Sequence, residues 1–265
     1  MTLLNCDIFI PVRLNSSRLP QKHLHLINDK PALLHLIERL QNCKKIRQII
    51  VCTTNHPTDD LLIQFLEKNN IKYFRGNEKD ILQRFLDAAN KFGTDIIIDV
   101  EGDKIYTDPF YVDEIAKKLI NDLNVDFIIG NDSQKIFNPA NHFIHGFIPA
   151  GIRKSALEKV CKLKKTNNTE TGYREFFLIP DMFNFEYLML NNFKFHENIR
   201  LTLDYDEDLE LARKIFAELG THFNINDVSN LFYKKPELLS ITEKIIREWE
   251  KNYQKNRTTT NLGNN

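Results

Sequence analysis

Three basic side chains lie close together near the start of the chain, in a loop that follows a mostly apolar stretch. Residues 7–12 predict a strand, and Arg13, Arg18 and Lys22 follow it among small hydroxyl side chains. Pro20 prevents a helix from beginning at once. Because the loops at the carboxyl ends of strands bind ligands in α/β proteins, this pattern favours a polyphosphate site. A solvated basic turn is the alternative.

Two aspartates in distant parts of the chain are the candidate metal ligands. Asp103 follows an apolar stretch at 95–100, and Asp204 lies in an acidic segment before a predicted helix. Mg²⁺ is commonly held by one or two carboxylates together with substrate phosphates and water, so two aspartates near a basic loop would form a nucleotide site. The alternative for Asp103 is a turn residue, and for Asp204 a helix cap.

Alternating strands and helices must position these side chains. Helical spacing of apolar residues follows each short apolar strand through the first half of the chain, which predicts an α/β fold with a mostly parallel sheet and right-handed crossovers. Ligands of such sheets collect beyond the carboxyl ends of the strands. The predicted strands are 7–12, 48–53, 71–74, 95–100 and 125–129, and the predicted helices are 33–40, 61–66, 81–92 and 110–122.

The periodicity weakens in the second half of the chain. We interpret the section of about 131–200 as a substrate-side or dimerisation insertion within a single domain, 1–255, and we expect the polar tail, 256–265, to be disordered. Strands are predicted at 143–152 and 185–190, a polar loop at 164–172, and helices at 155–163, 206–219 and 241–249.

Composition limits the function further. Lys plus Arg and Asp plus Glu both number 36, so a formal net charge of zero argues against a nucleic-acid binder. The start of the chain does not resemble a signal peptide and no stretch could cross a bilayer, so we expect a cytoplasmic protein without a membrane partner. Four cysteines without a CxxC pair predict buried reduced thiols: Cys6, Cys43, Cys52 and Cys161.

Several motifs resemble one family in the same order. Residues 10–22, IPVRLNSSRLPQK, are similar to the I-x-A-R-x-x-S-x-R-L-P-G-K signature of the cytidylyltransferases that make CMP-activated acidic sugars. Residues 74–85, FRGNEKDILQRF, resemble an element of the spore-coat polysaccharide branch of that superfamily. Residues 201–210, LTLDYDEDLE, resemble its R-x-T-[VL]-D-x-x-E-D-L-E element. The resemblance also extends to the 3-deoxy-manno-octulosonate and acylneuraminate cytidylyltransferases, and it is weak between about residue 120 and residue 200.

The resemblance implies a three-layer α/β/α nucleotidyltransferase fold, Rossmann-like in its mostly parallel sheet. It also implies Mg²⁺-dependent transfer of CMP from CTP to an acidic sugar for surface glycan synthesis, with release of pyrophosphate, in a homodimer. Under this resemblance the expected roles are nucleotide binding for Arg13, Ser17, Arg18, Lys22, Thr53 and Glu101, although Glu101 stands where the octulosonate branch has Gln. Arg18, Lys22, Asp103 and Asp204 would act in catalysis, with Asp103 and Asp204 as Mg²⁺ ligands.

The chain departs from the family pattern at several positions. Gln21 stands where the family usually has Gly and Asn15 where Gly or Ala is common, so we expect loop backbone angles that residues with side chains adopt easily. Lys104 follows the expected metal ligand where the octulosonate branch has Glu and the spore-coat branch has Cys. This extra cation could pair with Asp103 or reach a phosphate.

The acceptor side is less defined. An acidic sugar needs a cation for its carboxylate, and Arg174 is the first candidate, with Arg153 and His145 as further candidate substrate contacts. Two alternatives stay open: a nucleotidyltransferase acting on a phosphorylated or phosphonate substrate, and a catalytically silent sugar-binding or glycosyltransferase-like homologue.

Overall fold

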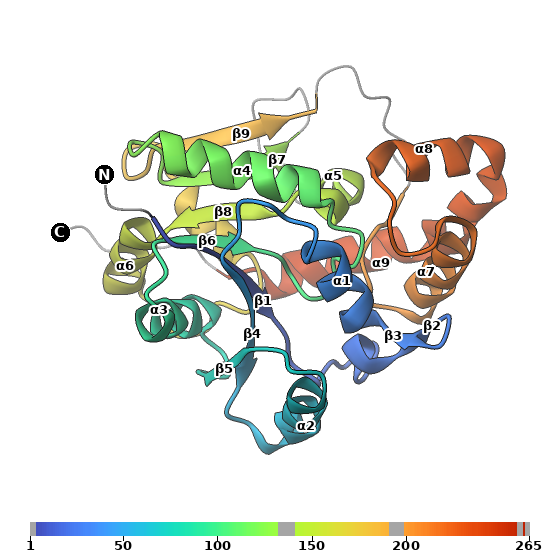
Figure 1. Cartoon of the computed structure of the whole chain (residues 1–265), viewed down its shortest axis with the longest axis horizontal. Coiled ribbons are helices and arrows are strands. Elements are labelled where there is room, and N and C mark those ends of the chain that lie inside the picture. Colours follow the sequence, from blue (N-terminus) through green and yellow to red (C-terminus); the bar gives the residue numbers. More distant parts are fainter. Residues whose placement is uncertain (1–3, 132–140, 191–198, 259–261, 263–265) are drawn as a thin grey trace.

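A seven-stranded sheet forms the centre of the molecule, with the strand order β5-β4-β1-β6-β8-β7-β9 (Figure 1). The computed structural model describes residues 4–131, 141–190, 199–258 and 262. A separate two-stranded ribbon is made by β2 (Leu26–Ile27) and β3 (Lys30–Pro31). The strands of the central sheet are β1 (Cys6–Pro11), β4 (Gln48–Thr54), β5 (Tyr73–Gly76), β6 (Ile96–Asp99), β7 (Phe127–Asn131), β8 (Ala150–Arg153) and β9 (Phe185–Met189).

Most neighbouring strands run parallel, as the alternating pattern predicts. β1 pairs in parallel with both β4 and β6, and β4 with β5. The exception is β8, which lies antiparallel between β6 and β7. Because β1, β4 and β6 share one direction, their carboxyl ends open at the same edge of the sheet, where the loops that follow β1 and β6 meet.

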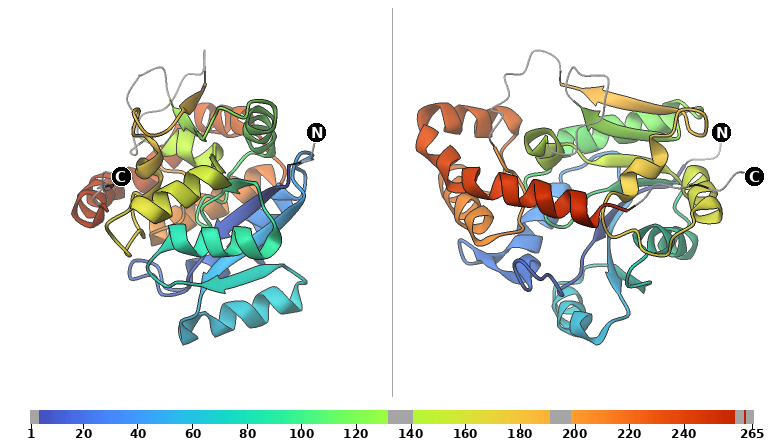
Figure 2. Two further views of the ribbon diagram at one scale, coloured as in Figure 1. Left: turned by 90° about the vertical axis from the view of Figure 1, so that its left-hand side faces the viewer. Right: turned by 180° about the vertical axis from the view of Figure 1, so that it is seen from behind.

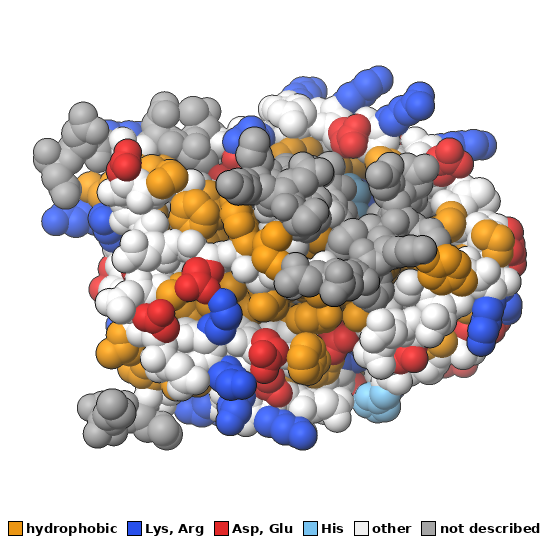
Figure 3. Space-filling view, turned by 90° about the horizontal axis from the view of Figure 1, so that it is seen from above, with side chains coloured by type: hydrophobic (Ala, Val, Ile, Leu, Met, Phe, Trp, Pro, Cys, Tyr) orange, Lys and Arg blue, Asp and Glu red, His pale blue; other side chains and the backbone are white. Residues whose placement is uncertain are grey.

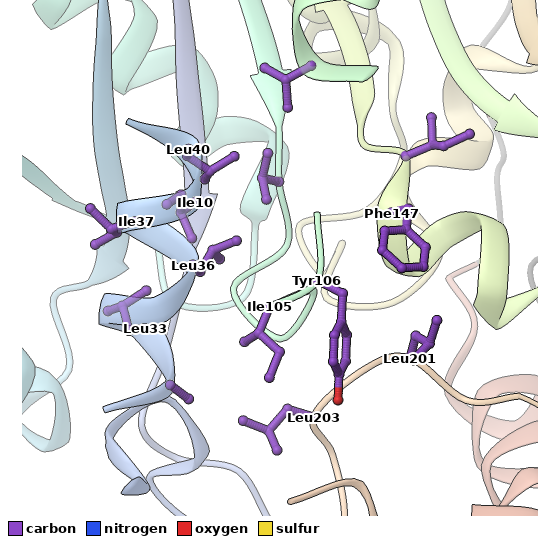
Figure 4. Packing of buried hydrophobic residues seen from close by; sticks show 14 of the residues in the cluster. Ile10, Leu33, Leu36, Ile37, Leu40, Ile105, Tyr106, Phe147, Leu201 and Leu203 are labelled. Atoms are coloured by element: carbon purple, nitrogen blue, oxygen red, sulfur yellow. The ribbon is translucent and has the colours of Figure 1, made fainter. Parts of the chain in front are cut away.

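Helices cover both faces of the sheet. Alternate strand residues belong to two separate hydrophobic clusters: Ile8 and Ile10 pack with α1 and α4 on one face, whereas Phe9 packs with α3 and α6 on the other. Figure 4 shows Ile10 beside apolar side chains of α1. The fold is therefore the expected three-layer α/β/α architecture. The α-helices are α1 (Ala32–Leu40), α2 (Asp60–Lys68), α3 (Ile81–Phe92), α4 (Pro109–Asn121), α5 (His142–Phe147), α6 (Lys154–Leu163), α7 (Asp206–Leu219), α8 (Ile225–Lys234) and α9 (Ser240–Asn256).

Local signals explain why the predicted helices end where they do. The Asp80 side chain caps α3 by accepting from the backbone N–H of Gln83, and Gly93 ends the helix in the left-handed conformation, with φ of 63°. Gly220, with φ of 70°, ends α7 at the predicted residue. The short 3₁₀ helices are η1 (Lys22–Leu24), η2 (Pro57–Asp59), η3 (Tyr173–Phe177) and η4 (Pro236–Leu239).

The weakly periodic section differs from the sequence prediction. Residues 143–152 were predicted as one strand, but 142–147 form α5 and only 150–153 form a strand, because every α5 side chain is buried and burial hides the helical period. The described part of the expected insertion, 131–200, is also continuous with the main fold, since it supplies β8, β9 and α6. Helix α8 was not predicted.

The chain end also differs from the prediction of a disordered tail. Arg257 forms an ion pair with Glu175, and the backbone N–H of Thr258 donates to the Thr171 carbonyl at 2.9 Å. Seen from behind, α9 runs across the molecule toward this contact (Figure 2). The sequence prediction failed because polar residues can be ordered by long-range contacts that composition does not show. Leu262 forms an isolated antiparallel bridge with Lys164, and residues 259–261 and 263–265 lie outside the described ranges.

The visible surface carries both signs of charge, and two of the four cysteines predicted to be buried are only half-buried. No helix within the described residues has the length and apolarity needed to span a bilayer. On the face seen from above, basic and acidic side chains are interspersed rather than gathered in one basic area (Figure 3). All four cysteines are free thiols, and Cys6 and Cys52 are buried.

Candidate active site

The loop after β1 is held by its apolar residues and one buried carboxylate. Leu14 and Leu19 are buried, so the loop is anchored at two points while its polar side chains face outward. The backbone N–H of Leu14 donates to Asp59 Oδ1 at 2.8 Å, and the N–H of Gln21 donates to the Leu14 carbonyl at 3.1 Å. These contacts fix where Lys22 begins the short helix η1.

Gln21 contradicts the expectation of ordinary backbone angles in this loop. Its φ and ψ of 55° and 27° place it in the left-handed region, which favours glycine. The chain therefore keeps the backbone turn that the family motif achieves with Gly, although it carries a side chain there. Asn15 is not among the described residues with positive φ.

Thr53, a predicted nucleotide contact, does not line the cavity that opens between the loops after β1 and β6. Its hydroxyl donates to Asp59 Oδ2 at 2.9 Å, and Thr54 donates to the same oxygen. Asp59 is fully buried and links the end of β4 to the Leu14 amide. Asp59 was not predicted as a site residue, but its position shortly after the end of β4 lets it support the basic loop.

Gly102 brings the loop after β6 against the loop after β1. A Cβ atom at this position would lie 2.7 Å from Val12 Cγ2 and 3.0 Å from the Pro11 carbonyl oxygen, so a side chain here would force the two loops apart. His23 also contacts this turn, with Nδ1 3.2 Å from the Gly102 carbonyl oxygen. The close approach places the next residue, Asp103, beside the basic loop.

Lys22 joins the two predicted metal ligands directly. Its Nζ donates to Asp103 Oδ2 and to Asp204 Oδ1, each at 2.7 Å, so residues about a hundred positions apart share one ammonium. Burial acts to raise the pKa of Asp103, but the positive charge of Lys22 outweighs it and the pKa lies below its usual value. The pKa of Lys22 is raised because its two carboxylate partners outweigh its burial.

Asp204 is the most heavily paired carboxylate of the site. Arg18 Nη2 donates to its Oδ1 at 2.9 Å, and Arg200 Nη2 donates to its Oδ2 at 2.7 Å. Despite burial, the three cations Lys22, Arg18 and Arg200 hold the pKa of Asp204 well below its usual range. Asp208 accepts from Arg200 Nε at 3.0 Å and thereby fixes the arginine. Neither Arg200 nor Asp208 was among the site residues predicted from the sequence.

A cavity of about 400 Å³ opens between the two loops. The predicted nucleotide-binding and catalytic residues Arg13, Ser17, Arg18, Lys22, Glu101, Asp103 and Asp204 all line it. Arg13 forms an ion pair with Glu170 at the exposed side of the cavity. Arg84, which was not predicted as a site residue, also lines the cavity and donates to the carbonyls of Asn77, Cys52 and Glu78.

The donor set fits a hard divalent cation. Asp103 Oδ1 is buried and has no hydrogen-bond partner, so one carboxylate oxygen remains available as a ligand. The described residues contain no group of three or more His, Cys, Asp or Glu side chains suited to hold a metal ion. Two carboxylates completed by phosphate oxygens and water match the usual Mg²⁺ coordination, whereas they do not match a structural zinc site.

The candidate acceptor residues have different outcomes. Arg174 and His145 line a second cavity of about 160 Å³ beside the first. The Arg174 guanidinium is already neutralised, with Nε 2.7 Å from Asp99 Oδ2 and Nη1 3.3 Å from Glu101 Oε2.

The prediction for Arg153 is wrong. Its guanidinium donates to the carbonyls of Leu119, Asp122 and Val125 at the end of α4, and it lines neither cavity. Arg153 is the last residue of β8, and from this position its side chain binds the segment that joins α4 to β7.

Comparison with known sequences decides the family. The family model described as cytidylyltransferase matches residues 8–245. This chain belongs to the cytidylyltransferase family. The match includes both loops, Lys22 and the two aspartates, so the site just described is built from family residues, whereas the last part of α9 lies beyond it.

Relatives and solved structures resemble the chain over most of its length. An uncharacterised protein of Methanocaldococcus jannaschii is 28% identical over 89% of this chain and 93% of its own. The spore coat polysaccharide biosynthesis protein SpsF of Bacillus subtilis is 23% identical over 86% and 94%. A cytidylyltransferase structure from Leptospira borgpetersenii has a TM-score of 0.77 at 26% identity, covering 89% of this chain and 97% of that one. The CMP:2-keto-3-deoxy-manno-octonic acid synthetase complexed with CTP has a TM-score of 0.62 at 17% identity, covering 81% and 99%, a likeness in fold.

Proposed function

We propose that this cytidylyltransferase transfers CMP from CTP to a sugar acid in a Mg²⁺-dependent reaction that releases pyrophosphate. The observation that carries the proposal is the Lys22 ammonium, which contacts Asp103 and Asp204 at the mouth of the basic loop. Phosphoryl transfer depends mainly on positioning and charge stabilisation, and this arrangement places cations and carboxylates around one cavity. The 3-deoxy-manno-octulosonate cytidylyltransferase of Geobacter sulfurreducens, 27% identical over 44% of this chain, supports a sugar-acid acceptor.

In the proposed reaction, the acceptor hydroxyl oxygen bonds to the α-phosphorus of CTP. The bond from that phosphorus to the oxygen bridging the β-phosphate breaks, and pyrophosphate leaves with the bond electrons. Arg13, Arg18 and Lys22 bind the triphosphate and stabilise the negative charge that grows on the leaving group. Mg²⁺, held by Asp103 and Asp204, would supply positive charge at the same phosphates.

Glu101 is the proposed acceptor of the hydroxyl proton. It lines both cavities, so it lies where an acceptor hydroxyl and the triphosphate would meet. Burial raises the pKa of Glu101, although Arg174 and Lys104 act against it, whereas the pKa values of Asp103 and Asp204 are lowered. A carboxylate with a raised pKa is the better general base, and the two aspartates suit a cation instead.

A pyrophosphate-release assay tests the proposal. CTP, UTP, GTP and ATP are each combined with sugar acids and sugar phosphates, with and without Mg²⁺; we expect turnover with CTP and a sugar acid only when Mg²⁺ is present. Asp103→Asn should lower kcat/KM by about 10²–10³. Asp206→Asn, an exposed carboxylate two residues beyond Asp204, is the matched control and should keep full activity.

Three outcomes would contradict parts of this proposal. Turnover with a sugar phosphate instead of a sugar acid would identify a nucleotidyltransferase of another acceptor class. Silence with every pair in a folded protein would identify a catalytically silent homologue. Unchanged Mg²⁺ dependence in Asp103→Asn would remove the metal role. We also propose a homodimer, which light scattering of the purified protein would test.

A further inference from the structure

The second cavity is built largely from parts of the chain that the basic loop does not include. Its walls come from the turn that follows β6, from η3 and from α9, and it meets the first cavity at Asp103 and Asp204. Trp249 and Tyr253 contribute one wall, and both lie beyond residue 245, where the family match ends. This wall is therefore supplied by the C-terminal helix α9.

The cations of this cavity are already paired, with one exception. Arg18 is paired with Asp204, and Arg174 with Asp99 and Glu101. Lys104 lines the cavity and has no ion-pair partner among the residues that the structure describes.

Lys104 is held in place by its backbone. Its N–H donates to the Glu101 carbonyl at 2.9 Å, and its own carbonyl accepts from the Thr107 N–H at 3.0 Å. These two hydrogen bonds place the Lys104 backbone in a tight turn rather than in a flexible segment. The Lys104 side chain is half-buried.

One part of the lining is aromatic. The Trp249 and Tyr253 rings stack with centroids 5.0 Å apart and an interplanar angle of 22°. The Tyr253 hydroxyl donates to Glu175 Oε1 at 2.6 Å, which fixes the orientation of its ring. Aromatic side chains and a cation in one cavity suit a polar ring that carries one negative group, because the ring can pack on the aromatic side chains while the charge meets the cation.

We infer that the second cavity is the acceptor subsite and that Lys104, rather than Arg174, binds the carboxylate of the sugar acid. This inference rests on the proposed function and assigns its specificity-determining residue. A single ammonium matches the one negative charge of a carboxylate. A phosphate dianion carries a second negative charge, which the nearby carboxylates Glu101, Asp103 and Glu175 would repel without a second unpaired cation in the cavity to offset it.

Tryptophan fluorescence tests the subsite without requiring turnover. The chain contains one tryptophan, Trp249, and it lines the second cavity, so its emission reports occupancy directly. The probes are 3-deoxy-manno-octulosonate and N-acetylneuraminate, the carboxamide of each acid, and mannose 1-phosphate. We expect at least one acid to change the emission with a Kd about tenfold lower than that of its carboxamide, which has the same shape without the charge.

Variants at Lys104 decide the residue assignment. Lys104→Met should make acid and carboxamide bind equally, and Lys104→Arg should keep the preference for the acid. Lys68→Met, an exposed lysine on α2, is the matched control and should leave the preference unchanged. The inference is overturned if no acid changes the emission, if Lys104→Met keeps the preference, or if mannose 1-phosphate binds more tightly than both acids.

Parallel pyrophosphate assays separate failure of the inference from failure of the proposed function. Binding that depends on Lys104 without CTP consumption would leave the subsite standing and remove the transferase function. The protein could instead turn over a sugar acid while Lys104→Met leaves the ratio of kcat/KM for the acid to kcat/KM for its carboxamide unchanged. That result would leave the transferase function standing and remove the assignment of Lys104. A higher KM for CTP alone in Lys104→Met would assign Lys104 to the triphosphate and also overturn the inference.

Discussion

The two cavities of this molecule share a border but are specified in different ways. The first cavity takes three basic side chains from one short loop, Arg13 to Lys22, and adds Arg84 from α3 and two aspartates. The second cavity is assembled largely from the turn at Lys104, from η3 and from the C-terminal helix. Both cavities combine residues of the family match with residues beyond it, Asn256 in the first and Trp249 and Tyr253 in the second. Most basic side chains of the first cavity are thus near neighbours in the sequence, whereas the lining of the second comes from segments that are far apart in the chain.

The largest expected effect is at the nucleotide side. Lys22→Met removes the cation shared by Asp103 and Asp204, and we expect kcat/KM to fall by about 10²–10³ for every acceptor, because the lost charge acts on the triphosphate. Steady-state pyrophosphate release measures it. Lys30→Met, whose lysine pairs with Glu38 outside the cavity, is the control. If Lys22→Met changed the preference among acceptors instead of lowering kcat/KM equally for all of them, the two cavities would not have separate roles.

His23 tests how burial behind the basic loop affects stability. Burial, helped by the charge of Lys22, lowers the pKa of His23 from 6.5 to about 4. Between about pH 4 and pH 6.5, the unfolded chain therefore binds a proton at this histidine that the folded chain does not. The contribution of this group to the unfolding free energy is present above pH 6.5 and is lost as the pH falls toward 4. The loss attributable to this group is about 3 kcal/mol at pH 4.

Urea unfolding at pH 7 and pH 4 measures this effect. His23→Gln cannot titrate but can still donate to the Gly102 carbonyl, so its unfolding free energy should fall by about 3 kcal/mol less than that of the wild type between these pH values. An identical pH dependence in both proteins would show that His23 is not held neutral.

A smaller effect is expected at the acceptor side. Tyr253→Phe removes the hydrogen bond to Glu175, and we expect the unfolding free energy to fall by about 1.5 kcal/mol, since the acceptor is a charged group that keeps Arg257 as its other partner. The KM for CTP should stay unchanged while the Kd for the sugar acid rises. Equal effects on both substrates would show that α9 supports the whole site rather than the acceptor cavity.

The smallest effect is expected at Gln21. Replacing it by glycine relieves the positive φ of the basic loop, so Gln21→Gly should raise the unfolding free energy by about 1 kcal/mol or less without changing turnover. Thermal and urea unfolding measure the change, with Gln21→Ala as the control that keeps a Cβ atom. Destabilisation of the glycine variant would mean that the Gln21 side chain contributes contacts that outweigh its backbone conformation.

The sequence predicted the parts of the site that rest on local pattern. The strand before Arg13, the amphipathic helix ending at Gly93 and the strand before Asp103 follow from side-chain periodicity and turn residues, which are properties of neighbouring positions. The same information failed for α5, where complete burial hides the period, and for Arg153 and Thr53, whose partners cannot be read from their own neighbourhood.

By itself, the sequence determined an α/β protein with a basic loop after its first strand and two aspartates available to face it. Only the tertiary structure decided that one ammonium contacts both aspartates, that Arg174 is held by Asp99 and Glu101, and that Lys104 lines one cavity with aromatic residues of α9. The physical reason is that secondary structure follows from short-range sterics and hydrophobic period, whereas charge pairing depends on which distant segments the packed core brings within a few ångströms.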